Sequence, residues 1–350
     1  MPHAITRRNT ASMPPANTAV TDRHGRTLRY LRLSVTDLCN LSCEYCNPLK
    51  GCYETHAYKL SWDDLAFLVE VATASLGVEA LRITGGEPTV RPGLAEWIAT
   101  IAPTPGLADI AMTTNGIRLA AMAPDLARAG LRRVNVSLDS FDPERYATLT
   151  RGGSLQRCLD GITAAQEHFH RVKINAVLLR DINDGELMDF LAFSDRTGIE
   201  VRFIELMPIF GQKDYFHRHY LAVEVLQQRL AEAGLVLHPE GDGAAAGNRT
   251  GYGPATTFSI EGTRARLGFI SQMSNTKCLS CNKLRITSDG ALKACLLSPD
   301  EVDLAPLIRK RDAAAIAAAL RGQFLDRAER YDAARLLTDP FTRSMQGIGG

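Results

Sequence analysis

Six short runs rich in apolar and β-branched residues alternate with helical stretches between residues 29 and 205. The runs cover residues 30–35, 80–84, 109–113, 134–137, 172–177 and 200–205, and amphipathic segments such as 61–75 separate them. Strands that alternate with helices in this way are typical of βα units and a parallel sheet. We therefore predict an α/β fold with functional residues gathered at the carboxyl ends of the strands.

The chain is long enough for more than one core. It has 350 residues, of which 45% are hydrophobic, and single cores stop growing at roughly 250 to 300 residues. We predict a flexible N-terminal extension over residues 1–27, a larger domain over 28–235 and a smaller one over 236–350. The Gly/Ala-rich stretch 241–253 is typical of a loop or linker.

Charge and cysteine content restrict the class of protein. Forty Lys and Arg residues stand against thirty-nine Asp and Glu residues, which argues against bulk binding to nucleic acid or an anionic membrane. No apolar run approaches the roughly 20 residues of a membrane span. Eight cysteines are too sparse for a disulfide scaffold and favour metal binding in a reducing compartment. We expect a cytoplasmic protein.

Three cysteines, Cys39, Cys43 and Cys46, lie in the loop after the first predicted strand. Three thiolates hold three irons of a four-iron, four-sulfur cluster and leave the fourth iron open to a small molecule. A zinc site or a disulfide remains the alternative. Cys52 is the one nearby candidate for a fourth ligand.

A second group, Cys278, Cys281 and Cys295, again offers three thiolates without a histidine at ligand spacing. A second cluster with an open iron is the favoured interpretation, with a three-cysteine zinc site as the alternative. Cys158 stands alone in a helical stretch and is expected to be a small core residue.

The two cysteine groups occur together with several specific strings. These are Leu-Arg-Leu-Ser-Val-Thr-Asp at 31–37, Leu-Arg-Ile-Thr-Gly-Gly-Glu-Pro at 81–88, Thr-Thr-Asn-Gly at 113–116, Asn-Val-Ser-Leu-Asp at 135–139, Arg-Phe-Ile-Glu-Leu-Met at 202–207, Cys-Leu-Ser-Cys-Asn-Lys-Leu-Arg at 278–285 and the final Gly-Gly. From about Tyr30 to the C-terminus, the chain resembles the GTP 3',8-cyclase family of molybdenum cofactor biosynthesis, within the radical S-adenosylmethionine (SAM) superfamily.

The resemblance implies a partial (βα)6 TIM-like radical SAM barrel with a smaller C-terminal α+β domain that carries a second iron-sulfur cluster. It implies a lyase that converts GTP to (8S)-3',8-cyclo-7,8-dihydroguanosine 5'-triphosphate, with two [4Fe-4S] clusters and SAM as cofactors. The implied partners are an electron donor of the flavodoxin or ferredoxin type and, downstream, cyclic pyranopterin monophosphate synthase. The sequence leaves open a monomer or a homodimer.

The resemblance also assigns residues. The six cysteines of the two groups would bind iron. The SAM-binding residues would be Tyr45, Gly86, Ser137 and Met207. The GTP-binding residues would be Arg32, Arg82, Thr113, Lys173, Lys283, Leu284 and Arg285, with Arg202 a weaker candidate. The residues assigned to catalysis are Arg285, Gly349 and Gly350.

Four positions depart from the family pattern. Lys283 replaces an arginine, Ala80 stands where some members have a lysine, Asn47 replaces a methionine, and Cys52 is extra. Lysine keeps the charge of arginine but loses its bidentate fork, so weaker or shifted phosphate binding is our hypothesis. Two alternative functions stay open: a different, peptide-modifying radical SAM enzyme with an auxiliary cluster, and a non-catalytic iron-sulfur electron carrier.

Overall fold

The computed structural model describes residues 19–46, 60–209, 212–240, 253–333, 335–338 and 343–350. Asn47, Cys52 and most of the predicted linker lie outside these residues. Within them, no helix is both long enough and apolar enough to cross a membrane.

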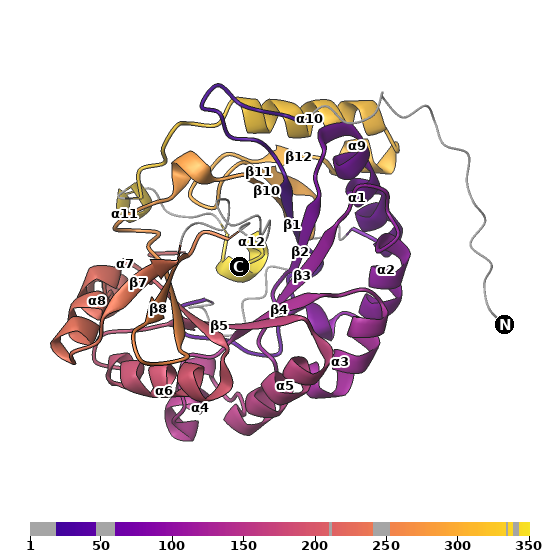
Figure 1. Ribbon diagram of the computed structural model, residues 1–350. Coiled ribbons are helices and arrows are strands. Elements are labelled where there is room, and N and C mark those ends of the chain that lie inside the picture. Colours follow the sequence, from indigo (N-terminus) through magenta and orange to yellow (C-terminus); the bar gives the residue numbers. More distant parts are fainter. Residues whose placement is uncertain (1–18, 47–59, 210–211, 241–252, 334, 339–342) are drawn as a thin grey trace.

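Six parallel strands form the central part of the sheet, in the order in which they occur along the chain. All six predicted strands are confirmed to within a residue or so. They are β1 (Tyr30–Ser34), β2 (Ala80–Thr84), β3 (Asp109–Thr114), β4 (Arg133–Ser137), β5 (Arg171–Val177) and β6 (Glu200–Ile204). The sheet curls around a central space in which the C-terminus lies (Figure 1).

Helices cover the outside of the curled sheet (Figure 1). They are α1 (Trp62–Leu76), α2 (Leu94–Ile101), α3 (Leu119–Arg128), α4 (Pro143–Thr150), α5 (Leu155–His168) and α6 (Leu187–Thr197). Ser61 begins α1 with a capping box: its hydroxyl accepts from the Asp64 amide, and the Asp64 side chain accepts from the Ser61 amide. Such reciprocal bonds satisfy donors that a helix start otherwise leaves unpaired. Cys158 is buried in the core on α5, as predicted.

The C-terminal part of the chain adds strands to both edges of the same sheet. After α7 (Lys213–His219) and α8 (Val223–Glu232), β9 (Arg266–Ile270) pairs in parallel with β6, followed outward by β8 (Thr256–Ile260) and β7 (Leu237–Glu240). At the other edge β10 (Lys283–Ile286) pairs in parallel with β1, followed by β11 (Ala291–Lys293) and β12 (Val302–Asp303). The two predicted domains therefore share one 12-stranded sheet.

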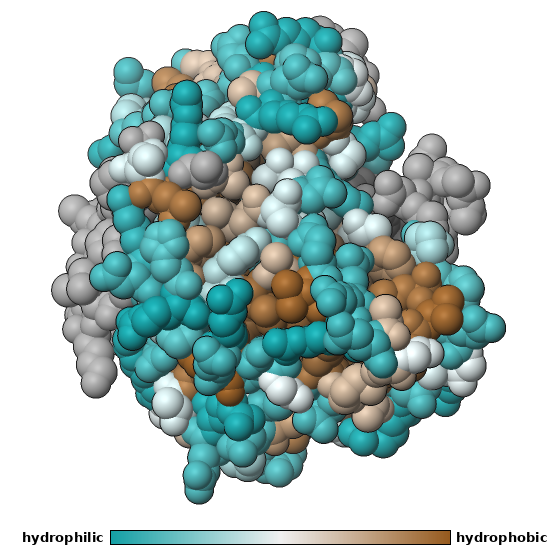
Figure 2. Space-filling model, turned by 90° about the vertical axis from the view of Figure 1, so that its left-hand side faces the viewer, coloured by the Kyte–Doolittle hydropathy of each residue, from teal (hydrophilic) through white to brown (hydrophobic). Residues whose placement is uncertain are grey.

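Four further helices complete the fold: α9 (Ala305–Arg309), α10 (Ala313–Leu325), α11 (Arg335–Thr338) and α12 (Met345–Ile348). α10 packs against α1 on the outside, whereas α12 lies in the centre of the barrel (Figure 1). The face of the molecule on the side of α7 and α8 is largely hydrophilic, with separate small hydrophobic patches (Figure 2).

Residues 19–27 differ from the predicted flexible extension. Val20, Asp22 and Arg26 are buried, and Thr21 and Thr27 form a β-bridge. Arg26 pairs with Asp22 at 2.6 Å and donates to the Cys278 carbonyl at 3.2 Å. Composition alone did not indicate this contact, because it joins residues about 250 positions apart in the chain.

Candidate active site

A cavity of about 1050 Å³ occupies the centre of the barrel, and all six cysteines of the two groups line it. Among the other residues assigned from sequence, Tyr45, Gly86, Ser137 and Met207 line it, as do Arg32, Arg82, Thr113, Lys173, Lys283, Arg285 and Gly350. Residues from both ends of the chain therefore meet in one space, although more than 200 positions separate the two cysteine groups.

The loop that carries the first cysteines lies directly against the turn after β2. A Cβ on Gly86 would lie 2.3 Å from the Leu38 carbonyl oxygen, and one on Gly85 would lie 2.5 Å from that of Thr36. The same two carbonyls accept hydrogen bonds from the turn: the Gly86 amide donates to Thr36 at 2.7 Å, and the Glu87 amide donates to Leu38 at 2.8 Å. Only glycine permits such close backbone approach, which explains the Gly-Gly pair at this turn.

Carboxylates surround the first cysteine group. Buried Glu87 accepts from the Thr114 hydroxyl at 2.8 Å and the Asn115 amide at 2.6 Å, and Tyr45 donates to Asp139 at 2.7 Å. Burial, with Glu87 as a further cause, raises the pKa of Cys39 to about 11. Burial, together with Cys39 and Asp139, raises the pKa of Cys46 to about 12. These thiols therefore need a cation or a metal to ionise at neutral pH.

Cations surround the second cysteine group instead. Burial opposes ionisation of Cys281, but the positive charges of Lys283 and Arg327 outweigh it, and the pKa of this thiol falls below its usual value. Burial raises the pKa of Cys295 to about 11. The two groups thus lie in environments of opposite charge.

Within the described residues, no three His, Cys, Asp or Glu side chains converge closely enough to hold a single metal ion. Ligation of iron by the two cysteine groups therefore stays a prediction, supported by their shared position on the cavity wall.

Three arginines form a row across neighbouring strands. The register places Arg285 of β10 beside Arg32 of β1, and Arg32 beside Arg82 of β2. Arg82 donates to the Tyr30 hydroxyl and, at 3.2 Å, to the Thr113 hydroxyl. Burial, and then the neighbouring charge of Arg285, lowers the pKa of Arg32 well below its usual value. Among the described residues, neither Arg32, Arg82 nor Arg285 has an ion pair with a carboxylate side chain. Such a row of arginines on a cavity wall calls for an anionic ligand.

A second cationic cluster lies farther around the barrel, on β5 and β6. Glu200 contacts Lys173 Nζ and Arg202 Nε, each at 2.6 Å. Burial raises the pKa of Glu200, but Arg202 and Lys173 more than compensate and bring it to about 2. The carboxylate neutralises one of the two cations. Burial, and then the charge of Arg202, lowers the pKa of Lys173 to about 7, so at most one positive charge remains here for a ligand near neutral pH.

The C-terminal glycines reach the arginine row. The Gly349 carbonyl accepts from Arg285 at 3.3 Å and from the Thr84 hydroxyl at 3.3 Å, and an oxygen of the terminal carboxylate of Gly350 accepts from Arg32. Gly349 ends α12 with a φ of +81°, and a Cβ there would lie 2.8 Å from the Cβ of Ser34. Both the left-handed backbone and the lack of space require glycine.

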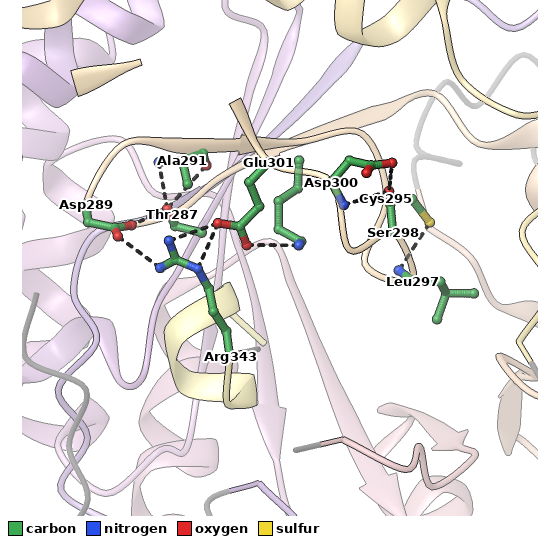
Figure 3. A network of polar contacts seen from close by, with 10 residues as sticks. Thr287, Asp289, Ala291, Cys295, Leu297, Ser298, Asp300, Glu301 and Arg343 are labelled. Atoms are coloured by element: carbon green, nitrogen blue, oxygen red, sulfur yellow. Dashed lines mark hydrogen bonds and ion pairs between the residues drawn. The ribbon is translucent and has the colours of Figure 1, made fainter. Parts of the chain in front are cut away.

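Arg343 lies just before α12 and connects the C-terminal tail, residues 343–350, to the segment 287–301 that follows β10. It contacts Asp289 and Glu301, each at 2.9 Å, and Glu301 also contacts Lys293 at 3.0 Å (Figure 3). Cys295 follows Lys293 by two residues, and its thiol accepts from the Leu297 amide at 3.4 Å. The base of the tail is thus attached to the segment that carries the third cysteine of the second group.

Leu284 corrects one sequence-based assignment. Its side chain is buried in the main hydrophobic core, because successive residues of a strand face opposite sides and its neighbours Lys283 and Arg285 face the cavity. A substrate contact by the Leu284 side chain is therefore not supported.

Sequence reasoning also missed many residues of the cavity wall, among them Tyr30, Glu200 and Arg327. Tyr30 is two positions from Arg32 on the same strand, so period-two alternation predicts the shared face. No local pattern indicates Arg327.

Comparisons with known proteins agree with this geometry. Residues 33–194 match the family described as Radical SAM superfamily, and residues 199–333 match Molybdenum Cofactor Synthesis C. Two solved structures share the fold: anSMEcpe with bound AdoMet (TM-score 0.55, 14% identity, 85% of this chain and 82% of that one) and Streptococcus suis SuiB bound to precursor peptide SuiA (TM-score 0.54, 16% identity, 91% and 66%).

Curated relatives are much more similar in sequence. The GTP 3',8-cyclase of Geobacter sulfurreducens is 40% identical over 331 residues, covering 94% of this chain and 99% of the relative. That of Limosilactobacillus fermentum is 39% identical over 336 residues, covering 94% and 98%. These relatives support the cyclase interpretation and neither of its two alternatives. The chain therefore belongs to the radical SAM superfamily and, within it, to the GTP 3',8-cyclase family.

Proposed function

We propose that this chain converts GTP to (8S)-3',8-cyclo-7,8-dihydroguanosine 5'-triphosphate, the first step of molybdenum cofactor biosynthesis. The observation that carries the proposal is the cavity lined by both cysteine groups and by an arginine row that, within the described residues, has no ion pair with a carboxylate side chain. A nucleoside triphosphate supplies the negative charge that such a row binds.

The first group, Cys39, Cys43 and Cys46, would hold one [4Fe-4S] cluster, and Gly86 in the turn after β2 would line the SAM pocket beside it. Tyr45, Ser137 and Met207 would form the other walls of the SAM pocket. When bound, cluster and SAM together supply the 5'-deoxyadenosyl radical that removes hydrogen from C3' of GTP.

The second group, Cys278, Cys281 and Cys295, would hold the other cluster and face the guanine. Arg32, Arg82, Lys283 and Arg285 would bind the phosphates, together with Lys173 and the Thr113 hydroxyl. The glycine tail contacts Arg32 and Arg285 and would orient both side chains toward the substrate.

We further propose that the protein works in the cytoplasm, as a monomer or a homodimer. An electron donor of the flavodoxin or ferredoxin type would reduce the first cluster, and cyclic pyranopterin monophosphate synthase would consume the product.

Anaerobic reconstitution with iron and sulfide, followed by incubation with GTP, SAM and a strong reductant, tests the proposal by mass analysis of the nucleotide. Cys39→Ala should abolish formation of 5'-deoxyadenosine, whereas Cys281→Ala should retain some SAM cleavage and form no cyclic nucleotide. Intact GTP after incubation of the loaded wild-type protein would refute the proposed function. Equal loss of both activities in Cys281→Ala would contradict separate roles for the two groups.

A further inference from the structure

Arg327 is a buried cation on the wall of the cavity beside the second cysteine group. Its Nη1 donates to the backbone carbonyls of Cys281 at 3.1 Å and Lys283 at 3.2 Å, so it bridges the segment between the second cysteine and β10.

One donor of Arg327 is unused. Its Nε is buried and has no hydrogen-bond partner among the described residues. A buried N–H without an acceptor costs about 1–3 kcal/mol, so its presence on a cavity wall points to an acceptor that belongs to a bound group.

The backbone around Arg327 is held from behind by a second arginine. Arg26 donates to the carbonyls of Arg327 at 3.4 Å, Glu329 at 3.2 Å and Cys278 at 3.2 Å, and pairs with Asp22 at 2.6 Å. Arg26 thus connects the backbone at residues 327–329 to the backbone of Cys278, and these contacts restrict Arg327 to its position beside Cys281.

We propose that Arg327 is a positioning residue for the iron-sulfur group on Cys278, Cys281 and Cys295, and that its charge and free Nε–H raise the reduction potential of that group. This inference rests on the proposed function. Reduction adds negative charge to a cluster, and a nearby cation or N–H donor stabilises the reduced form. Among the described residues, the charged neighbours of the first cysteine group are the carboxylates Glu87 and Asp139, which do not stabilise a reduced cluster in this way.

The test uses the full chain with Cys39, Cys43 and Cys46 replaced by alanine, so that only the second cluster assembles. Iron and sulfide per chain are measured first, and the midpoint potential is then measured by an anaerobic titration followed by electron paramagnetic resonance. Arg327→Met, Arg327→Gln and Arg327→Lys are compared with this parent. Arg330→Met, an exposed neighbour, is the control for loss of one positive charge.

At the potential that half-reduces the parent, we expect Arg327→Met to lower the ratio of reduced to oxidised cluster about tenfold, a shift of about 59 mV for one electron. Arg327→Lys should recover part of the shift because it keeps the charge, and Arg330→Met should match the parent. An unchanged midpoint potential in Arg327→Met and Arg327→Gln at full iron content would overturn this inference and leave the proposed function standing. Loss of iron from all three Arg327 variants would assign the residue a purely structural role and also overturn it. A parent without iron would overturn the inference and the proposed function together.

Discussion

Replacing Arg343 by methionine should release the C-terminal tail from the cavity. Arg343 is 14% exposed, and its partners Asp289 and Glu301 are 13% and 20% exposed. After the substitution Glu301 keeps Lys293 as a partner, whereas Asp289 loses this cation. The substitution therefore removes one ion pair from a largely buried carboxylate, which keeps its hydrogen bond with the Thr287 hydroxyl.

The size of the effect follows from this degree of burial. Removing one partner of a fully buried ion pair costs about 3–5 kcal/mol, whereas exposed pairs contribute about 0–1 kcal/mol. For this partly buried pair we take about 2 kcal/mol, which changes the ratio of docked to released tail about 30-fold. Local opening of this kind does not require the barrel to unfold.

Hydrogen exchange followed by mass spectrometry measures tail release directly. The Gly349 and Gly350 amides both donate to the Met345 carbonyl, at 3.1 and 3.0 Å, and are protected while α12 is formed. We expect exchange in the C-terminal peptide to accelerate about 30-fold, the factor worked out above, while peptides from β2 and β3 keep their wild-type rates. Arg335→Met, at an exposed position, removes the same charge and should leave exchange unchanged. Equal exchange in the two variants would show that the ion pairs do not hold the tail.

Four further outcomes are expected. Deleting residues 349–350 should spare SAM cleavage and impair cyclisation; normal amounts of cyclic product would contradict the role of the tail. Lys283→Arg should lower the KM for GTP by restoring a bidentate fork, and an unchanged KM would refute our hypothesis. Gly86→Ala should reduce the iron bound by the first cysteine group, because its Cβ would lie 2.3 Å from the Leu38 carbonyl oxygen; wild-type iron content would count against this packing. Glu200→Gln should lower the free energy of unfolding near neutral pH by about 3 kcal/mol. Since the pKa of Glu200 is about 2 when folded and about 4.5 when unfolded, this deficit should shrink as pH falls from 4.5 toward 2, and a constant deficit in urea titrations would contradict the ion-pair geometry.

The strands and the faces of their residues could be predicted because they depend on local sequence. Alternation placed Arg32 and Arg82 on the inner face of their strands, and the cysteine spacing pointed to two metal groups. The same rule should have directed Leu284 outward. The assignment of Leu284 to GTP binding followed the family motif and stays a prediction, whereas the period of two that governs a strand accounts for its side chain in the core.

Contacts between distant segments could not be predicted in this way. The alternation of a strand gives the face of a residue but not its neighbour on the next strand, so the row Arg285, Arg32 and Arg82 appears only once β10 is paired with β1. The ion pairs of Arg343 and the contact of Arg26 with Cys278 likewise join segments whose approach depends on the whole fold.

The same register links two of the family departures to each other. Tyr30 lies opposite Ala80 on one side and Lys283 on the other, and Lys283 Nζ is 6.0 Å from the centre of the Tyr30 ring. Tyr30 in turn accepts from Arg82. A lysine at position 80 would add a positive charge on one side of this ring. An arginine at position 283 would place a bidentate guanidinium on the other side. Positions 80 and 283 both neighbour Tyr30, and Tyr30 accepts a hydrogen bond from Arg82 of the row. The effects of the two departures on phosphate binding should therefore not be additive.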